Sequence, residues 1–426
     1  MTLGPPRRGS ARPFARELTI EQVGAQGDGL AEGLFVPGAL PGEQVLARGA
    51  GDRAESVEVL TPSPERQAPP CPHYGDCGGC ALQHWAQAPY LAWKSEQIAT
   101  ALARVGIATD ILTPFAAPPG SRRRLALHAR RWRPAEAALG FKARRSWRLV
   151  PIEVCPVADP RLVAALPALR RLAASLFEAP KSAPILHTTL TETGIDVDIS
   201  GVERKVGALS ADARQRLAES AAADDLARVT LDGEIVYLAR QPVVRVGTAS
   251  VALPAGAFLQ AVAAAEIAMA AFVGEALAGA EAIADLYCGI GTFALRLAAQ
   301  APVLAADVSA PAIRSLMAAQ GALPGLKAIT AEARDLSRRP LLAHDLRRID
   351  AAVIDPPRAG APEQHRELAA SGATRVAGVS CNPATFARDA HILVDAGFRL
   401  VRVLPVDQFL WSPHIELVGV FERSKR

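Results

Sequence analysis

Hydrophobic and polar residues alternate differently in successive parts of the chain, which predicts several domains. Between residues 14 and 61, short apolar runs such as "RELTIEQV" and "ESVEVLTP" are separated by glycine and proline, as is typical of a small β-barrel of the OB type. A helix-like stretch, "YLAWKSEQIATALARVG", follows. Residues 121–240 mix strand-like runs with Ala- and Leu-rich helical runs. From residue 241 onward, apolar strand-like and helical runs alternate, which predicts a doubly wound parallel sheet.

These patterns divide the chain into five parts. Their predicted boundaries are a disordered basic tail at 1–13, the barrel at 14–61, a cysteine segment with a linker helix at 62–120, a central domain at 121–240 and a C-terminal domain at 241–426. The predicted fold class is α/β, with a doubly wound, Rossmann-like C-terminal domain, an OB-like barrel and an α+β central domain. The chain has no apolar run of about 18 residues and no signal peptide, so we expect a cytoplasmic protein with no membrane partner. We also expect a monomer.

The basic residues are concentrated in one segment of the central domain. Residues 121–148 contain ten Arg and Lys against one acid, Glu136, although the formal net charge of the whole chain is only +4. Trp132, Phe141 and Trp147 are interleaved with these cations. Guanidinium groups bind phosphates and aromatic faces stack on bases, so we expect a nucleic-acid surface here; a solvated face is the alternative.

Three of the six cysteines lie within ten positions, in "CPHYGDCGGC". These are Cys71, Cys77 and Cys80. Because thiols stay reduced in the cytoplasm, clustered cysteines indicate a metal or catalytic site before disulfides. Sites held only by thiolates usually need four, and no fourth cysteine lies nearby in the sequence.

The C-terminal domain contains "AIADLYCGIGTFALRLAA", an apolar strand, a glycine turn and an amphipathic helix. Gly289 and Gly291 would let the backbone approach a ligand at the carboxyl end of the strand. The spacing differs from the G-x-G-x-x-G fingerprint, so a nicotinamide enzyme is disfavoured. Asp307 ends the next strand, where an acid can accept ribose hydroxyls, and Glu332 follows another apolar run, where an acid can meet an adenine. This arrangement favours S-adenosylmethionine; a generic α/β turn is the alternative.

Two more reactive side chains are predicted at the same edge of the sheet. "AAVIDPPRAG" places Asp355 after one apolar strand, and "RVAGVSCNPATFARD" places Cys381 after another. A free cysteine is more often a small core residue, but the strand end and the Asn-Pro that follows favour a functional one. By itself, the pair formed by His414 and Glu416 is typical of a solvated edge strand.

Taken together, these stretches resemble the S-adenosylmethionine-dependent RNA 5-methyluridine (uracil-C5) methyltransferases. They look closest to the branch that has an N-terminal TRAM domain and an iron–sulfur cluster and that modifies 23S ribosomal RNA. The resemblance covers nearly the whole chain in the family's order. Its motifs are "FVPGALPGEQV", "SPERQAPPCPHYGDCGGCALQH", "SRRRLALHAR", "LGFKARRSWRLVPIEVCPV", "DLYCGIGTFAL", "DPPRAG" and "SCNPATFARD".

The resemblance implies roles for single residues in catalysis and in cofactor binding. Cys381 matches the nucleophile, Glu416 the base that removes the C5 proton, and Phe258 an aromatic that stacks near the target base. The implied contacts of S-adenosyl-L-methionine are Gln260, Tyr287, Asp307, Glu332 and Asp355. Leu259 and Val262 depart from the family's Phe-Phe-Gln-x-Asn pattern, which puts details of substrate or helix capping in doubt but not the reaction.

The resemblance and the cysteine count agree on a metal site. The implied ligands of a [4Fe–4S] cluster are Cys71, Cys77, Cys80 and Cys155. Of the other two cysteines, Cys381 is the nucleophile and Cys288 is a packed small residue. The C-x5-C-x2-C spacing with a distant fourth cysteine favours an iron–sulfur site, and zinc stays open as the alternative. We expect the cluster to be structural.

We therefore expect a uridine C5 methyltransferase whose partner is RNA, ribosomal RNA in particular. Transfer RNA is one alternative substrate, and a non-catalytic iron–sulfur protein for RNA binding or ribosome assembly is another reading. DNA cytosine methylation would need a Pro-Cys motif, which "SCNP" is not. Because the cofactor crevice is assigned to another domain, we expect replacement of Arg122–Arg124 to weaken RNA binding without changing cofactor affinity.

Overall fold

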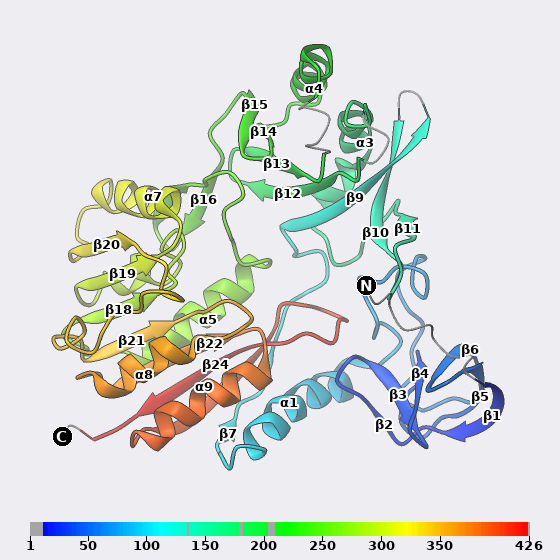
Figure 1. Cartoon of the computed structure of the whole chain (residues 1–426), viewed down its shortest axis with the longest axis horizontal. Coiled ribbons are helices and arrows are strands. Elements are labelled where there is room, and N and C mark those ends of the chain that lie inside the picture. The colour runs from blue at the N-terminus through cyan, green and yellow to red at the C-terminus, as the bar shows by residue number, and fades with distance from the viewer. Residues whose placement is uncertain (1–11, 134–135, 179–181, 203–208, 425–426) are drawn as a thin grey trace, which may run out of the picture. The chain divides into compact units, whose positions relative to one another are not determined.

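The computed structural model describes residues 12–133, 136–178, 182–202 and 209–424 (Figure 1). The chain forms two compact units, Met1–Lys94 with Trp411–Pro413, and Ser95–Leu410 with His414–Arg426. The tail expected at 1–13 lies outside the described residues except for its last two positions, and the first strand begins at Pro13.

The first unit is built on a six-stranded sheet in the order β1-β5-β6-β4-β3-β2. Its strands are β1 (Pro13–Thr19), β2 (Gln22–Val23), β3 (Asp28–Ala31), β4 (Leu34–Pro37), β5 (Gln44–Ala50) and β6 (Arg53–Thr61). Alternating apolar positions such as Val45 and Ala47 on β5 are buried and form its core with Leu18 and Val36. Closure of this sheet into an OB-type barrel stays a prediction.

The cysteine segment follows β6 and leads into helix α1 (Gln87–Ala103). A second small core packs at the start of this helix and contains Leu82, Trp85 and Tyr90. Trp93 extends it and donates its indole N–H to the carbonyl oxygen of Val23 at 2.9 Å. Aromatic side chains therefore anchor the first two turns of the helix, which belong to this unit, to its sheet.

The central domain, in the second unit, has a seven-stranded sheet in the order β11-β10-β9-β12-β13-β14-β15. Its elements are β9 (Arg124–Arg133), β10 (Glu136–Lys142), β11 (Leu149–Pro151), β12 (Ile185–Thr191), β13 (Gly194–Ser200), β14 (Arg228–Leu231), β15 (Glu234–Leu238), α2 (Pro160–Ala164), α3 (Leu166–Ala174) and α4 (Ala211–Ala223). Leu125 and Leu127 alternate along β9 and pack against Leu169 and Leu172 of α3. The short hairpin β16 (Val243–Val246) and β17 (Ala249–Ala252) leads out of this domain.

The C-terminal sheet follows the order β20-β19-β18-β21-β22-β24-β23-β7, and β8 pairs with β23. Its strands are β18 (Ile283–Leu286), β19 (Val303–Asp307), β20 (Ile329–Ala333), β21 (Ala351–Ile354), β22 (Arg375–Ser380), β23 (Arg399–Asp407), β24 (Glu416–Glu422), β7 (Asp110–Ile111) and β8 (Phe115–Ala116). Its helices are α5 (Ala263–Ala276), α6 (Ala294–Leu297), α7 (Ala310–Gly321), α8 (Pro362–Ala370) and α9 (Pro383–Asp395). Pairing is parallel from β20 to β22, and β24 is antiparallel to β22. The predicted α/β class with a doubly wound sheet is confirmed for this domain.

Both faces of this sheet are covered. Ile283 belongs to a core that includes α5, α6 and α7, whereas its neighbour Ala284 belongs to a core that includes α8 and α9. The chain moves from β18 to β19 on one side and later returns to β21 on the other, so the strand order reverses beside β18. Ligands of open α/β sheets bind at such a point, at the carboxyl ends of the strands. Within the described residues, no helix is long and apolar enough to cross a membrane.

Candidate active site

A cavity of about 720 Å³ opens at the carboxyl ends of the C-terminal strands. Its walls contain most residues that the sequence singled out for catalysis and cofactor binding: Phe258, Gln260, Tyr287, Asp307, Asp355, Cys381 and Glu416. The central domain contributes to the same cavity through Arg122, Arg124 and His187. Its volume lies within the range of small-molecule sites.

Sheet topology explains why these side chains meet. Asp355 follows β21 and Cys381 follows β22, two adjacent parallel strands. Because β24 is antiparallel to β22 and begins where β22 ends, its first residue, Glu416, lies at the same edge. Gln408 follows β23, which pairs antiparallel with β24 and therefore ends at that edge too. Four strand termini thus deliver four polar side chains to one place.

The turn after β18 forms another wall. Tyr287 has a positive φ of 65°, which is uncommon for a residue with a side chain and is often found at functional sites. At Gly289, whose φ is also positive, an added Cβ would face open space. The N–H of Gly289 donates to Asp307 at 2.9 Å, and the N–H of Ser309 donates to its other carboxylate oxygen at 2.8 Å. These two bonds fix the carboxylate of Asp307 beside the turn.

Cys381 is half-buried, and its surroundings disfavour the thiolate. Burial raises its pKa to about 11, with the carboxylates of Glu416 and Asp355 adding to the effect and Arg358 opposing it. The thiol directly precedes Asn382, which caps α9 by accepting from the N–H of Ala384 at 3.1 Å. The positive end of a helix favours an adjacent thiolate, so local charge balance decides the reactivity of this cysteine.

Glu416 and Asp355 are buried carboxyls linked by two amides. Burial raises the pKa of both; the proximity of Asp355 raises that of Glu416 further, while hydrogen bonds from Gln408 and Gln260 lower the pKa of Glu416 and Asp355, respectively. Gln408 Nε2 donates to Glu416 Oε2 and to Gln260 Oε1, both at 2.8 Å, and Gln260 Nε2 donates to Asp355 Oδ2 at 3.3 Å. Raised carboxyl pKa values are typical of groups that accept or release protons near neutral pH.

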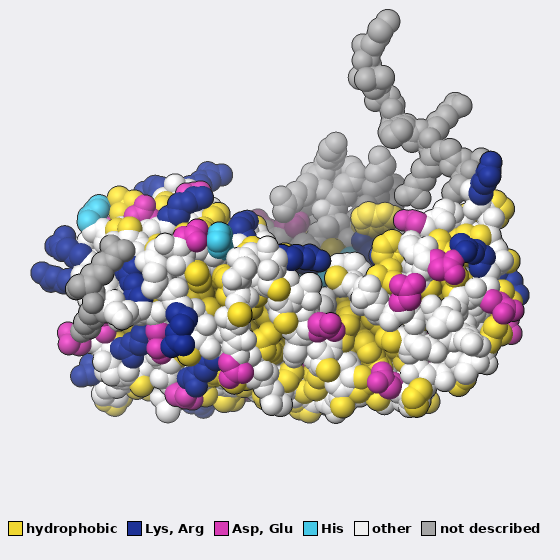
Figure 2. All heavy atoms as spheres, turned by 90° about the horizontal axis from the view of Figure 1, so that it is seen from below, with side chains coloured by type: hydrophobic (Ala, Val, Ile, Leu, Met, Phe, Trp, Pro, Cys, Tyr) yellow, Lys and Arg dark blue, Asp and Glu magenta, His cyan; other side chains and the backbone are white. Residues whose placement is uncertain are grey.

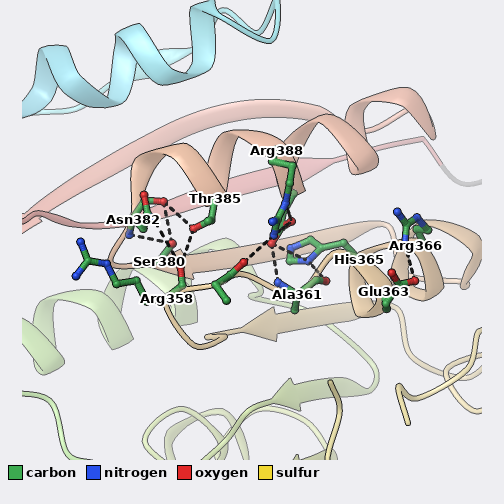
Figure 3. A network of polar contacts seen from close by, with 11 residues as sticks. Arg358, Ala361, Glu363, His365, Arg366, Ser380, Asn382, Thr385 and Arg388 are labelled. Atoms are coloured by element: carbon green, nitrogen blue, oxygen red, sulfur yellow. Dashed lines mark hydrogen bonds and ion pairs between the residues drawn. The ribbon is translucent and has the colours of Figure 1, made fainter. Parts of the chain in front are cut away.

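A network behind the cavity holds the Asp355 loop against the Cys381 loop (Figure 3). The carbonyl oxygen of Arg358 accepts from Thr385 Oγ1 at 3.1 Å and from Asn382 Nδ2 at 3.4 Å. The N–H of Ala361 donates to Asp389 at 2.7 Å, and Arg388 donates to a carbonyl of the same loop. The "DPPRAG" and "SCNPATFARD" motifs are therefore joined at several points.

The arginine triplet Arg122–Arg124 does not lie free on the surface. The guanidinium of Arg123 donates to the carbonyl of Gln260 at 3.0 Å and to Glu266 at 2.6 Å. Arg124 donates to the carbonyls of Leu259 at 2.8 Å and Ala257 at 3.1 Å, and its guanidinium lies 6.0 Å from the ring centre of Phe258. The triplet lies in the central domain, but Arg123 and Arg124 hydrogen-bond to the segment 257–261, which lines the cavity. A separate domain therefore does not make cofactor affinity independent of these arginines.

The comparisons with known proteins agree with this geometry. The family model described as tRNA (uracil-5-)-methyltransferase matches residues 237–425. A protein of Caulobacter vibrioides named as an uncharacterized RNA methyltransferase is 63% identical over 96% of this chain and 100% of its own length. The 23S rRNA (uracil(1939)-C(5))-methyltransferase RlmD of Pseudomonas entomophila is 36% identical over 96% of this chain and 93% of its own. The chain belongs to the RNA uracil-5-methyltransferase family.

The fold of the family is also seen in a solved structure. The Pyrococcus abyssi tRNA (uracil-54, C5)-methyltransferase in complex with S-adenosyl-L-homocysteine superposes with a TM-score of 0.73, covering 95% of this chain and 99% of that one. The sequences are 22% identical, so this likeness concerns the fold.

One residue that the family resemblance implied lies apart from the cavity. Glu332 is on β20, paired with Ala306 of β19, and its side chain is 45% exposed and forms an ion pair with Arg334 at 3.1 Å. It is absent from the residues that line the cavity. Its contact with the cofactor stays a prediction.

The four cysteines expected to hold a metal do not gather in the described residues. No group of three or more His, Cys, Asp or Glu side chains in that part of the chain is placed to hold a metal ion. Cys71, Cys77 and Cys80 lie in loops of the first unit, and Cys155 belongs to the second, where it packs at the edge of the central core. The N–H of Gly79 lies 3.5 Å from the sulfur of Cys77. The arrangement of these residues therefore does not support the predicted cluster, which stays a prediction.

The rest of the basic segment has both exposed and buried side chains. Trp132 on β9 and Trp147 in the turn before β11 are 64% and 84% exposed, whereas Phe141 packs against the central core. The ammonium of Lys142 lies 3.8 Å from the ring centre of Trp147. The face shown in Figure 2 carries acidic and basic side chains side by side.

Sequence reasoning did not point to Gln408 or Val308, and it assigned Arg124 to RNA binding instead of to the cavity. Gln408 and Arg124 act through contacts with residues 148 and 135 positions away, which no local motif shows. Val308 is a 68% exposed apolar residue of the cavity wall directly after Asp307. An apolar residue directly after the acid at a strand end was the available signal.

Proposed function

We propose that this chain transfers a methyl group from S-adenosylmethionine to C5 of a uridine in RNA, through a covalent bond between Cys381 and C6 of the base. The observation that carries the proposal is the meeting of Cys381, Glu416 and Asp355 in one cavity. These are the residue types that the reaction needs, and three separate strands deliver them.

The first role belongs to the sulfur of Cys381. C5 of uracil is a poor nucleophile, and addition of the thiolate to C6 moves the π electrons of the C5–C6 bond into an enolate with negative character at C5. The cofactor supplies an electrophilic methyl group on a sulfonium. Arg358 and the start of α9 favour the thiolate, while the two buried carboxylates oppose it.

The second role belongs to Glu416. Once C5 carries the methyl group, its proton must leave so that the electron pair can reform the double bond and expel Cys381 as a thiolate. Glu416 is buried in the same cavity and its pKa is raised, which suits a carboxylate that accepts a carbon-bound proton. Cysteine and carboxylate thus act before and after methyl transfer, respectively.

The cofactor is assigned to the wall formed by the β18 turn and the end of β19. Gly289 leaves open space for close approach, Asp307 is held beside it as an acceptor for ribose hydroxyls, and Val308 offers apolar surface. Gln260, Tyr287 and Asp355 line the same cavity. These features fit the nucleoside part of S-adenosylmethionine.

Ribosomal RNA is the proposed substrate class, 23S rRNA in particular. The 36% identity to the Pseudomonas entomophila enzyme over nearly the whole chain supports this, and the family model's description keeps tRNA as the competitor. Trp132 on β9 and Trp147 between β10 and β11 are exposed and lie in the Arg-rich segment, so they supply stacking surfaces, and the arginines phosphate ligands, for an unpaired RNA segment.

A [4Fe–4S] cluster on Cys71, Cys77, Cys80 and Cys155 is proposed on the chemistry of four reduced thiols and on the family resemblance. No step of the reaction depends on it. Anaerobic purification should give a brown protein with bound iron and sulfide. A colourless protein with one zinc per chain would replace the cluster with the zinc alternative.

The function is tested by mapping 5-methyluridine in 23S rRNA and in total tRNA from a deletion strain and its parent. The deletion should remove 5-methyluridine from one position of 23S rRNA, and the purified protein should restore it on a transcript with S-adenosylmethionine. Loss from tRNA alone would assign the competitor substrate, and unchanged RNA of both kinds would reject the proposed activity.

A further inference from the structure

Gln408 is a buried polar residue that has no role in the proposed reaction. It follows β23, is 3% exposed, and lines the cavity together with Cys381. Its amide nitrogen donates both hydrogens, one to Glu416 Oε2 and one to Gln260 Oε1, each at 2.8 Å. Its amide oxygen is buried and has no hydrogen-bond partner within the part of the chain that the structure describes.

The orientation of this amide follows from its neighbours. If the oxygen and nitrogen exchanged places, a carbonyl would face a carboxylate and a second carbonyl, and two hydrogen bonds would become repulsive contacts. The nitrogen must therefore point toward Glu416 for as long as Glu416 is ionised. Gln260 continues the series by donating to Asp355 at 3.3 Å.

Packing alone does not explain Gln408. Gln364, another fully buried glutamine of the same domain, satisfies both ends of its amide on the backbone of Leu341, at 2.9 and 3.0 Å. Gln408 instead leaves its acceptor without a partner among the described residues, and a buried polar atom without a partner is destabilising. We therefore look for a function in the side-chain N–H groups of Gln408, which bind Glu416 and Gln260.

We propose that Gln408 is a positioning residue for the base: it holds one oxygen of Glu416 and keeps the carboxylate ionised, which leaves the other oxygen to take the C5 proton. This inference rests on the proposed function. Among the ionisable groups that line the cavity, Asp355 raises the pKa of Glu416, and Glu416 in turn raises the pKa of Cys381. The N–H of Gln408 acts in the other direction by lowering the pKa of Glu416.

The test separates methyl transfer from release of the product. In single-turnover reactions of a 23S rRNA transcript with radiolabelled S-adenosylmethionine, Gln408→Met should incorporate methyl at nearly the wild-type rate. The methylated RNA should then stay covalently bound, and its release should slow by about tenfold or more, the range of a lost charge-assisted hydrogen bond. The acid limb of the release rate should move to higher pH, because the base loses the donor that keeps it ionised.

Two further variants keep the result interpretable. Gln364→Met removes a buried amide remote from the cavity and should leave the pH dependence of release unchanged, whatever its effect on stability. Gln408→Glu preserves the shape of the side chain and adds a carboxylate to the pair Glu416 and Asp355. It should therefore move the acid limb of the release rate to higher pH at least as far as Gln408→Met does. It also serves if the methionine variant fails to fold.

The inference is overturned if folded Gln408 variants release product at the wild-type rate and pH dependence, or if methyl transfer and release slow by the same factor. The variant Glu416→Gln distinguishes failure of the proposed role of Gln408 from failure of the proposed function. If that variant accumulates the bound RNA while the Gln408 variants do not, only the role of Gln408 is rejected. If wild-type protein never forms a covalent species and Glu416→Gln turns over normally, the proposed mechanism is rejected as well.

Discussion

The cavity and the cysteine segment both contain cysteines that the sequence marked as functional, but only in the cavity do strands bring the predicted partners together. Cys381 follows a central strand, and the same edge of the sheet brings Asp355 and Glu416 beside it. Cys71, Cys77 and Cys80 lie on a loop, and no metal-holding group forms among the described residues. Strand pairing alone brings the side chains of the cavity together. Metal-binding side chains on loops, in contrast, generally take up their arrangement only when the metal is bound.

The largest expected effect is that of Cys381→Ala, which removes the proposed nucleophile. Methyl transfer should fall by about 10⁴-fold or more, the scale seen when a covalent nucleophile is removed. Cys288→Ala, which changes a buried cysteine absent from the cavity wall, should stay active. The rate is measured by radiolabelled methyl incorporation into RNA. If Cys288→Ala is inactive and Cys381→Ala is not, the assignment of the two cysteines must be exchanged.

Arg124→Met tests whether the central domain supports the cavity or only binds RNA. The variant loses two bonds to backbone carbonyls of the segment that carries Phe258 and Gln260, so affinity for S-adenosylhomocysteine and methyl transfer should fall about 10- to 100-fold. Arg130→Gln and Arg133→Gln, on the exposed part of β9, should leave affinity for S-adenosylhomocysteine unchanged and reduce the salt dependence of RNA binding. Calorimetry and filter binding measure the two quantities. Equal effects of all three variants on cofactor affinity would contradict the proposed support of the cavity.

Cys155→Ser tests whether the cysteine segment binds a metal without contributing to catalysis. The variant should lose bound iron and unfold at a lower temperature, because metal ligation contributes to folding. Methyl transfer per folded molecule should fall far less than in Cys381→Ala, since Cys155 is absent from the cavity wall. Iron content, thermal unfolding and rate are measured on the same preparation. Unchanged iron content would exclude Cys155 from the metal site.

The smallest expected effects concern the charges around Cys381. Glu416 raises and Arg358 lowers the pKa of this thiol. Glu416→Gln should therefore lower the pKa and speed alkylation of Cys381 by iodoacetamide at pH 8, and Arg358→Met should raise the pKa and slow it. Each change should be about 3- to 10-fold, because one pKa unit changes the thiolate fraction tenfold. Mass spectrometry of the Cys381 peptide measures the rate, and effects of the same sign would show that charge does not control this thiol.

Sequence reasoning succeeded where a residue's position depends on strand order alone. Asp355 and Cys381 each follow a short apolar run, and adjacent parallel strands bring such residues together. Glu416 was identified only through the family resemblance, because its own surroundings are typical of an edge strand until β24 is seen to run antiparallel to β22.

Other features depend on contacts that the sequence does not encode locally. Arg124 was counted as part of a basic surface, but its guanidinium reaches carbonyls of a segment 133–135 positions away. Gln408 gains its place from Glu416 and Gln260. Charge counting cannot tell an arginine that meets RNA from one that holds a loop.

The covalent route is tested most directly with RNA that carries 5-fluorouridine at the target position. Fluorine cannot be removed as a proton, so after methyl transfer the thioether between Cys381 and C6 should persist. We predict a protein–RNA complex that survives denaturing electrophoresis, contains one added methyl group, and maps to the Cys381 peptide by mass spectrometry. Cys381→Ala should give none. Methyl transfer to normal RNA without any trapped complex on the fluorinated RNA, or a complex that maps to another residue, would contradict the account.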